Sequence, residues 1–149
     1  MTSLTQDLEV TESLVIKNDT IINLNNNNII NKSSSIDNKC TINVTKSLVI
    51  KGEGIINGGS GNIYSRSILD INKGYCEIHS GEFVIGSDVN NSDIFGIKIT
   101  NGVLKISGGT FEAINGQVIN ASNSVVEITG GLFKNYNPEM YVADGYKAL

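Results

Sequence analysis

One segment recurs along the chain with the same order of apolar, polar and glycine residues, and this repeat restricts the fold more than any other feature. Three copies match plainly: CEIHSGEF at residues 76–83, LKISGGTF at 104–111 and VEITGGLF at 126–133. Two earlier segments, LVIKNDTI at 14–21 and LVIKGEGI at 48–55, fit the same frame with Ile in place of Phe. Five similar segments predict a repeat architecture in which successive copies stack on one another.

The isoleucine that all copies share marks the length of each repeat. It stands at Ile16, Ile50, Ile78, Ile106 and Ile128. The separations are therefore 34, 28, 28 and 22 residues, and this unequal spacing favours a β-solenoid with loops of different length over rigid helical repeats. The first and longest interval contains four consecutive asparagines and three consecutive serines, which predict an expanded loop over residues 23–39.

Apolar and polar residues alternate within each copy, as they do in a β-strand with one buried face. The shared isoleucine and the apolar residue two positions before it point inward, whereas the residues between them, such as Glu77 and Lys105, point outward. A third apolar column follows five residues after the isoleucine, at Ile21, Ile55, Phe83, Phe111 and Phe133. Glycines between the strand and this column predict a corner. A second alternating pair upstream, such as Ile97 and Ile99, predicts another strand in each repeat.

The expected fold is all-β, a short single-stranded parallel β-helix (solenoid) of about five coils with a C-terminal cap. Because stacked strands lie ~4.8 Å apart, equivalent residues of successive coils would form ladders. A β-sandwich does not require such constant columns. We expect an N-terminal cap or attachment segment at residues 1–12, the β-helix repeats at 13–133 and a C-terminal capping tail at 134–149. The tail leaves the repeat and holds three of the five tyrosines and the only proline.

The composition agrees with this fold and argues against several other classes. The chain has 149 residues, 40% of them hydrophobic, with 16 Gly and a single Pro, and its many β-branched residues argue against a helical bundle. A net charge of -4 gives no basic surface, so we expect no nucleic-acid partner. No stretch approaches the ~20 apolar residues of a membrane span, and no signal peptide is visible, so we expect no membrane partner and synthesis in a cytoplasm. Cys40 and Cys76 are expected to be reduced and partly buried thiols.

The side chains that a polysaccharide-degrading β-helix would use are sparse. Such sites need two or three carboxylates that converge on one face. Glu77 and Glu127 occupy equivalent positions two coils apart with Lys105 between them, which predicts a row of alternating charge instead of an acid–base pair. His79, the only histidine, falls in a column filled otherwise by Lys, Ser and Thr, which indicates a surface position. We expect a protein that is not an enzyme and has no cofactor and no metal site.

The end of the chain resembles a known family. The last repeat, with Gly-Gly-Leu-Phe, is followed by Asn-Pro-Glu-Met-Tyr-Val-Ala-Asp-Gly-Tyr. Residues 104–147 are similar to the terminal module of β-helical surface proteins from gut bacteria and their tailed phages, in which a Gly-Gly-x-Phe coil precedes an Asp/Asn-Pro-x-x-Tyr-Val-x-x-Gly-Tyr tail. The resemblance implies a structural or adhesive module. It further implies a virion component assembled in the host cytoplasm, such as a capsid decoration or head-fibre protein of a crAss-like or related phage; the alternative location is the bacterial cell surface.

Partner contacts follow from the outward apolar residues and the tail. Val15 and Val49 fall in a column that is charged in later coils, so we expect them to lie on adjacent strands and to form a contact surface with Tyr141 and Tyr146 as further candidates. Alternatively, the N-terminal segment or the Asn-rich loop covers the two valines. The expected partners are the protein itself, as a homodimer or homotrimer, and other virion proteins such as the capsid.

Two other functions remain open at this point. The first is a carbohydrate- or host-binding adhesin module that holds a host surface glycan with the loops at residues 23–39, 57–67 and 86–95. The second is a polysaccharide-degrading enzyme that uses Asp88 and Asp93. The same two aspartates lie in a loop that could loosely hold Ca²⁺ through oxygen ligands.

Overall fold

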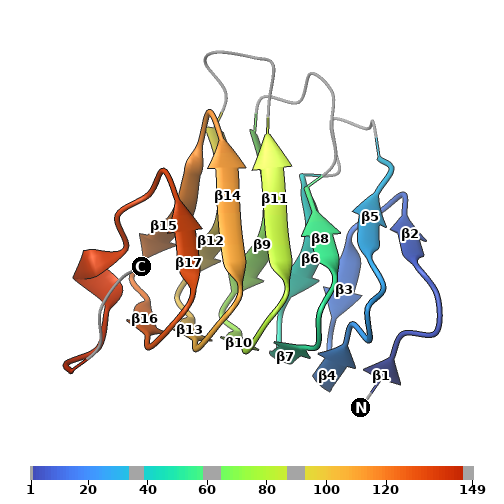
Figure 1. The fold of residues 1–149 in the computed structure, drawn as a ribbon, viewed down its shortest axis with the longest axis horizontal. Coiled ribbons are helices and arrows are strands. Elements are labelled where there is room, and N and C mark those ends of the chain that lie inside the picture. Colours follow the sequence, from blue (N-terminus) through green and yellow to red (C-terminus); the bar gives the residue numbers. More distant parts are fainter. Residues whose placement is uncertain (1, 34–38, 59–64, 87–92, 146–149) are drawn as a thin grey trace.

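The chain folds into a short parallel β-helix. The computed structural model describes residues 2–33, 39–58, 65–86 and 93–145 (Figure 1). Seventeen strands and one short 3-10 helix, η1 (Glu139–Tyr141), make up its regular structure within these ranges. Every pair of neighbouring strands is parallel, and the strands form three sheets that run along the rod. The predicted fold class is therefore confirmed.

Each sheet takes one strand from each coil. Sheet A contains β1 (Thr2–Ser3), β4 (Asp19–Asn23), β7 (Ser47–Lys51), β10 (Tyr75–Ile78), β13 (Val103–Ile106) and β16 (Val125–Ile128). Sheet B contains β2 (Leu8–Val10), β5 (Ile29–Asn31), β8 (Ile55–Asn57), β11 (Glu82–Gly86), β14 (Thr110–Ile114) and β17 (Leu132–Lys134). Sheet C contains β3 (Leu14–Ile16), β6 (Cys40–Val44), β9 (Ser65–Asn72), β12 (Asp93–Thr100) and β15 (Gln117–Ser122).

The chain passes through sheets A, B and C in turn, which gives five coils and a partial sixth that ends with β17. The two termini lie toward opposite ends of the rod (Figure 1). The solenoid begins earlier than the expected boundary, because β1 and β2 lie within residues 1–12 and pair with β4 and β5. Residues 2–12 therefore belong to the first coil and are not a separate segment in front of it.

The predicted register of the first repeat was wrong. Ile16 lies in sheet C, where it pairs with Val44, and the true partner of Ile50 in sheet A is Ile22. The separations from Ile22 onward are 28, 28, 28 and 22 residues, so the first interval is not expanded. The expected loop at residues 23–39 contains strand β5, and its residues 34–38 lie outside the described part of the chain.

The third apolar column was predicted correctly for the later coils and wrongly for the earlier ones. Phe83 pairs with Ile56, not with Ile55, because Ile56 follows Ile50 by six positions whereas Phe83 follows the paired Ile78 by five. Ile55 and Ile21 point outward and are each 39% exposed. The column that faces the core consists of Ile29, Ile56, Phe83, Phe111 and Phe133. The upstream pairs in sheet C stack as predicted, with Ile97 and Ile99 fully buried.

The C-terminal end of the rod is covered by the tail. The ring of Tyr136 lies against that of Phe133, with centroids 6.5 Å apart, and its hydroxyl donates to the carbonyl oxygen of Ile119 at 3.3 Å. Val142 forms a parallel bridge with Ile128, and the Ala143 N–H donates to the Ile128 carbonyl. The described part of the tail, residues 134–145, thus caps the last coil with rings and a short continuation of sheet A.

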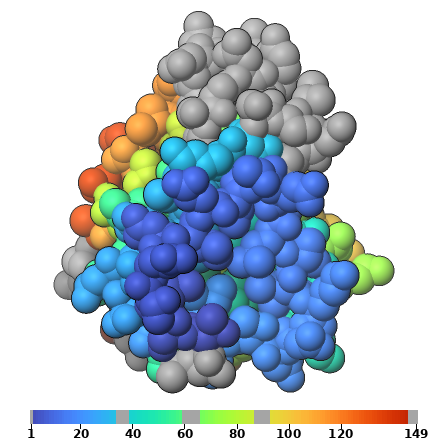
Figure 2. Space-filling view, turned by 90° about the vertical axis from the view of Figure 1, so that its right-hand side faces the viewer, coloured from blue at the N-terminus to red at the C-terminus, as the bar shows by residue number. Residues whose placement is uncertain are grey.

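The N-terminal end has no comparable cover among the described residues. Three inward residues of the first coil, Leu4, Leu8 and Leu14, are only partly buried, although Val10 and Ile16 of the same coil are buried. Their neighbours in the second coil, Leu24, Ile29 and Ile42, are fully buried. Figure 2 looks onto this end, whose surface is formed by the first two coils. The two ends of the rod therefore differ in how well the core is shielded from water.

Candidate binding surface on sheet A

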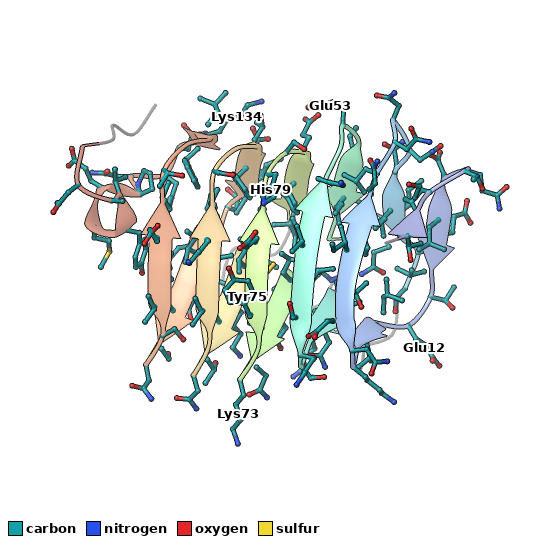
Figure 3. All side chains as sticks on the ribbon, turned by 90° about the horizontal axis from the view of Figure 1, so that it is seen from below. Glu12, Glu53, Lys73, Tyr75, His79 and Lys134 are labelled. Atoms are coloured by element: carbon teal, nitrogen blue, oxygen red, sulfur yellow. The ribbon has the colours of Figure 1, made fainter. Side chains whose placement is uncertain are left out.

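The outer face of sheet A carries three parallel columns of side chains, because every second residue of each strand points away from the core. The first column is Asp19, Ser47, Tyr75, Val103 and Val125. The second is Ile21, Val49, Glu77, Lys105 and Glu127. The third, after the strands end, includes His79, Ser107 and Thr129. Figure 3 looks onto this face, with Tyr75 and His79 along β10 and Lys73 extending from the corner before it.

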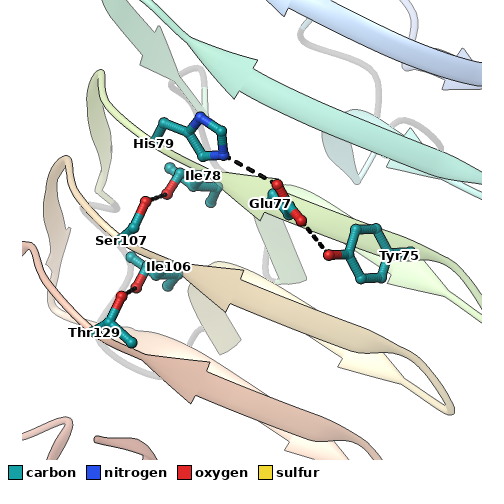
Figure 4. Close-up of polar contacts among 7 residues, drawn as sticks. All are labelled: Tyr75, Glu77, Ile78, His79, Ile106, Ser107 and Thr129. Carbon is teal, nitrogen blue, oxygen red and sulfur yellow. Dashed lines mark hydrogen bonds and ion pairs between the residues drawn. The ribbon is translucent and has the colours of Figure 1, made fainter. Parts of the chain in front are cut away.

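The side chains of Tyr75 and Glu77 on β10 and of His79, the residue after this strand, form a hydrogen-bonded row (Figure 4). The Tyr75 hydroxyl donates to Oε1 of Glu77, and Nε2 of His79 lies 3.0 Å from Oε2 of the same carboxylate. The hydrogen bond from Tyr75, followed by that from His79, lowers the pKa of Glu77. The same contact with Glu77 raises the pKa of Tyr75 to about 12. Glu77 is therefore a carboxylate and Tyr75 a neutral phenol near neutral pH.

The predicted row of alternating charge has the right register but no close ion pairs. Lys105 lies beside Glu77 and Glu127 in the ladder, yet no salt bridge within 4.0 Å joins these residues. Its ammonium nitrogen is instead 6.0 Å from the centre of the Tyr75 ring. In the described residues, the cross-strand ion pair is on sheet B, where Lys134 lies 3.8 Å from Glu112.

A small hollow of about 230 Å³ lies over the second and third columns, between Glu77, Lys105 and Glu127. Its two hydroxyl groups serve the stacking of the coils, since Ser107 and Thr129 donate to the carbonyls of Ile78 and Ile106 at 3.4 Å (Figure 4). A glycosidase needs a carboxylic acid with a raised pKa to protonate the leaving oxygen. The pKa of Glu77 is lowered instead, so Glu77 is poorly suited to be that acid.

A longer groove of about 550 Å³ follows the corner between sheets C and A. Its lining comes from the same position in five successive strands and from the turns that precede four of them, so the groove runs along the axis of the rod. Asn101 and Asn123 occupy these turns with φ of 53° and 48°, the left-handed region that Asn tolerates well. Nδ2 of Asn123 donates to Oδ1 of Asn101 at 2.6 Å, so the two side chains form a short asparagine ladder at this corner.

The predicted contact residues do not form one surface. Val15 is 42% exposed on sheet C, where it pairs with Asn43, whereas Val49 is half-buried on sheet A. The expectation that they lie on adjacent strands was therefore wrong, and it failed because it used the incorrect register of the first coil. The neighbour of Val49 is Ile21. Tyr141 is half-buried against the core, and Tyr146 lies outside the described residues.

The loops proposed for glycan or calcium binding can be placed only in part. Residues 34–38, 59–64 and 87–92, and with them Asp88, lie outside the described ranges. Asp93 begins β12 and is exposed. No group of three or more His, Cys, Asp or Glu side chains within the described ranges could hold a metal ion. No helix in this part of the chain is both long and apolar enough to cross a bilayer.

Both cysteines are free and buried in the described structure. Burial raises the pKa of the Cys76 thiol to about 12. The pKa of Cys40 is also raised by burial, and its sulfur lies 3.3 Å from the Ser13 hydroxyl.

Sequence reasoning missed the corner groove and the Tyr75–Glu77–His79 row. The groove joins residues that are 22 to 28 positions apart, and its signal in the sequence is the turn before each sheet A strand, where Asn101 and Asn123 align. The row is visible as three outward residues at every second position, although the alternation alone says nothing of their hydrogen bonds. No family model, curated protein or solved structure matches this chain.

Proposed function

We propose that this protein is a non-enzymatic structural component of a phage virion, a capsid decoration or head-fibre protein that associates with copies of itself. The observation that carries the proposal is that the two ends of the rod differ in how well the core is covered. Tyr136 covers the C-terminal end, whereas Leu4, Leu8 and Leu14 of the first coil stay partly exposed. Open solenoid ends are normally covered, because they expose apolar side chains and unpaired strand edges.

The charge of the first coil favours a different protein over a second copy as the cover of this end. The first coil, residues 2–18, contains Asp7, Glu9 and Glu12 against a single basic residue, Lys17. All three carboxylates are exposed, so two copies meeting by their N-terminal ends would bring like charges together. A basic surface on another virion protein would complement this end and keep the rod pointing away from the particle.

The outer face of sheet B is the surface that favours self-association. It carries three of the seven large hydrophobic side chains that are exposed within the described residues: Ile55 at 39%, Ile114 at 48% and Leu132 at 44%. Ile114 and Leu132 flank the Glu112–Lys134 ion pair on β14 and β17, whereas Ile55 lies on β8, beyond Glu82 of β11. Apolar side chains bordered by polar ones are typical of protein interfaces. Side-by-side association through sheet B would leave both ends of the rod available.

Light scattering coupled to size exclusion tests the self-association directly. We expect a dimer or trimer of the 16.0 kDa chain, and we expect Ile114→Ser combined with Leu132→Ser to shift it to the monomer. Val15→Ser is the matched control, because Val15 is equally exposed but lies on sheet C. A monomer at high concentration would count against self-association. The genes beside the coding gene test the virion role, since capsid and portal genes are expected there.

A further inference from the structure

We infer that the groove along the corner between sheets C and A is a binding site for an uncharged linear oligosaccharide. The inference goes beyond the proposed virion role and does not depend on it. The groove is about 550 Å³ in volume and is lined by equivalent positions of five successive strands. A ligand that fills it must therefore be extended along the axis of the rod.

The floor and the rim of the groove differ in chemistry. The floor contains the ring of Tyr75 and the side chains of Val103 and Val125, the last of which is 61% exposed. Asn101 and Asn123 stand at the rim and are exposed. A sugar ring has one face of C–H groups, which packs on aromatic and aliphatic surface, and an edge of hydroxyls, which needs hydrogen-bonding partners. The groove offers both kinds of surface side by side.

The two rim amides are joined to each other. Nδ2 of Asn123 donates to Oδ1 of Asn101 at 2.6 Å, so each amide keeps one hydrogen-bonding atom for a ligand. This leaves Nδ2 of Asn101 as a donor and Oδ1 of Asn123 as an acceptor, with no further protein partner in the described part of the chain. Sugar hydroxyls both donate and accept hydrogen bonds, so one sugar unit could bond to both of these amide atoms.

The spacing of the coils matches a polymer better than a single small molecule. Successive coils rise by ~4.8 Å, which is close to the length of one sugar unit in an extended β-linked chain. Adjacent sugars would then meet the same kind of position in adjacent coils, at Tyr75, Val103 and Val125. Each contact is weak, so affinity should rise steeply with the number of sugars that the groove holds.

The charge of the groove favours an uncharged ligand. Lys46 and Lys73 line it together with Asp19, so its walls carry both signs. The neighbouring column adds Glu77, Lys105 and Glu127, so lysines and carboxylates balance at and beside the groove. Because neither sign is in excess there, the groove gives no electrostatic preference for an acidic polysaccharide or for nucleic acid.

Calorimetric titration of the full chain with defined sugars tests the inference. The probes are the β-linked hexasaccharides of glucose, N-acetylglucosamine and mannose, with a hexameric oligouronate as the acidic comparison. We expect at least one neutral hexasaccharide to bind, at least tenfold more tightly than its disaccharide and more tightly than the oligouronate. No binding of any neutral hexasaccharide, or stronger binding of the oligouronate, would overturn the inference.

Two variants locate the site. Asn101→Gly combined with Asn123→Gly removes both amides, and glycine accepts the positive φ of these turns without strain. We expect this variant to bind at least tenfold more weakly. Asn135→Gly is the matched control, because Asn135 is also exposed and has φ of 54° but does not line the groove. Equal affinities of the double variant and the control would show that the sugar binds elsewhere and would overturn the assignment. Tyr75→Ala should weaken binding as well, provided that circular dichroism shows the β fold intact.

Discussion

The rings of Phe83 and Phe111 stack inside the solenoid with their centroids 4.9 Å apart and their planes inclined by only 11°. Phe133 continues the stack on the other side of Phe111, at 5.0 Å and 10°. This geometry follows from the backbone, because in-register parallel strands repeat at ~4.8 Å and oblige identical side chains to adopt the same orientation. The phenylalanine ladder therefore reports how regularly the last three coils are stacked.

Phe111→Ala is expected to lower the free energy of unfolding by about 3–5 kcal/mol, the usual cost of a large cavity in a core. The side chain is 1% exposed and packs between two other rings, so its neighbours cannot readily fill the space. Urea denaturation followed by circular dichroism measures the change. Thr110→Ala is the control, since Thr110 precedes Phe111 but points outward, and it should change stability by less than about 0.5 kcal/mol. Similar losses in the two variants would contradict the inward assignment.

The later coils could be predicted from the sequence because two signals agree there. The Gly-Gly corner and the phenylalanine that follows it fix the register of residues 104–111 and 126–133, and the structure pairs them as predicted. Where a single corner glycine remains, as at Gly81, the aromatic ring still marks the column. Where glycine and phenylalanine recur together from coil to coil, they are thus sufficient to predict the register of the strands.

The first coil could not be predicted because β-branched residues suit every sheet. The segment at 14–17 has the same sequence as 48–51, Leu-Val-Ile-Lys, yet its strand lies in sheet C and pairs with 42–44. The true counterpart of Ile50 is Ile22, whose neighbours lack the glycine and phenylalanine that mark the later coils. Alternation alone gives the inward and outward faces of a strand but does not say which sheet the strand joins. The corner groove was missed for a related reason, since it depends on how turns from different coils meet.

The corrected register predicts opposite outcomes for two neighbouring isoleucines. Ile22→Asp places a charge at a position that is 5% exposed, and we expect it to prevent folding at neutral pH. Ile21→Asp places the same charge at a position that is 39% exposed, and we expect it to fold and to lose less than about 1 kcal/mol. Circular dichroism and size exclusion distinguish the two results. If Ile21→Asp prevented folding and Ile22→Asp did not, the register predicted from the sequence, in which Ile21 faces the core, would be the correct one.

The glycine corners predict a clash between successive coils. A Cβ added to Gly108 would lie 2.3 Å from the carbonyl oxygen of His79 in the preceding coil, so Gly108→Ala must push two backbones apart. We expect a loss of about 1–3 kcal/mol in the free energy of unfolding, the usual cost of overpacking. Gly145→Ala is the comparison, because Gly145 has a positive φ of 87° but no atom within 4 Å of its added Cβ. Thermal denaturation should show the larger fall in melting temperature for Gly108→Ala, and equal falls would mean that contact between the coils is not responsible.

The lowered pKa of Glu77 predicts that the folded protein loses a little stability in acid. The hydrogen bonds from Tyr75 and His79 lower the pKa of Glu77 in the folded protein. Its contribution is therefore present above the unfolded pKa of about 4.3 and is lost as the pH falls through the lower, folded value. Because the group is close to solvent, screening holds the contribution to at most about 1 kcal/mol.

Glu77→Gln should accordingly reduce the difference in unfolding free energy between about pH 7 and about pH 3, measured by urea denaturation. Glu127→Gln serves as the control, since Glu127 occupies the same column and makes no hydrogen bond or ion pair within the described structure. If both variants show the full acid dependence of the unmodified protein, the Tyr75–Glu77–His79 row does not contribute to it.

The buried thiol of Cys76 reports on the opening of the solenoid. Its side chain is fully buried, and burial raises its pKa to about 12, so the reactive thiolate is scarce in the folded state. In a Cys40→Ala background, a thiol reagent should react with Cys76 at least about 1,000-fold more slowly under native conditions than in denaturant, because reaction requires unfolding. Phe111→Ala should accelerate the native reaction in proportion to the stability it removes, since the opening equilibrium then shifts toward the unfolded chain. Rapid labelling of the unmodified fold, or a rate that Phe111→Ala leaves unchanged, would mean that Cys76 is reached by a local opening of β10 without loss of the stacked core.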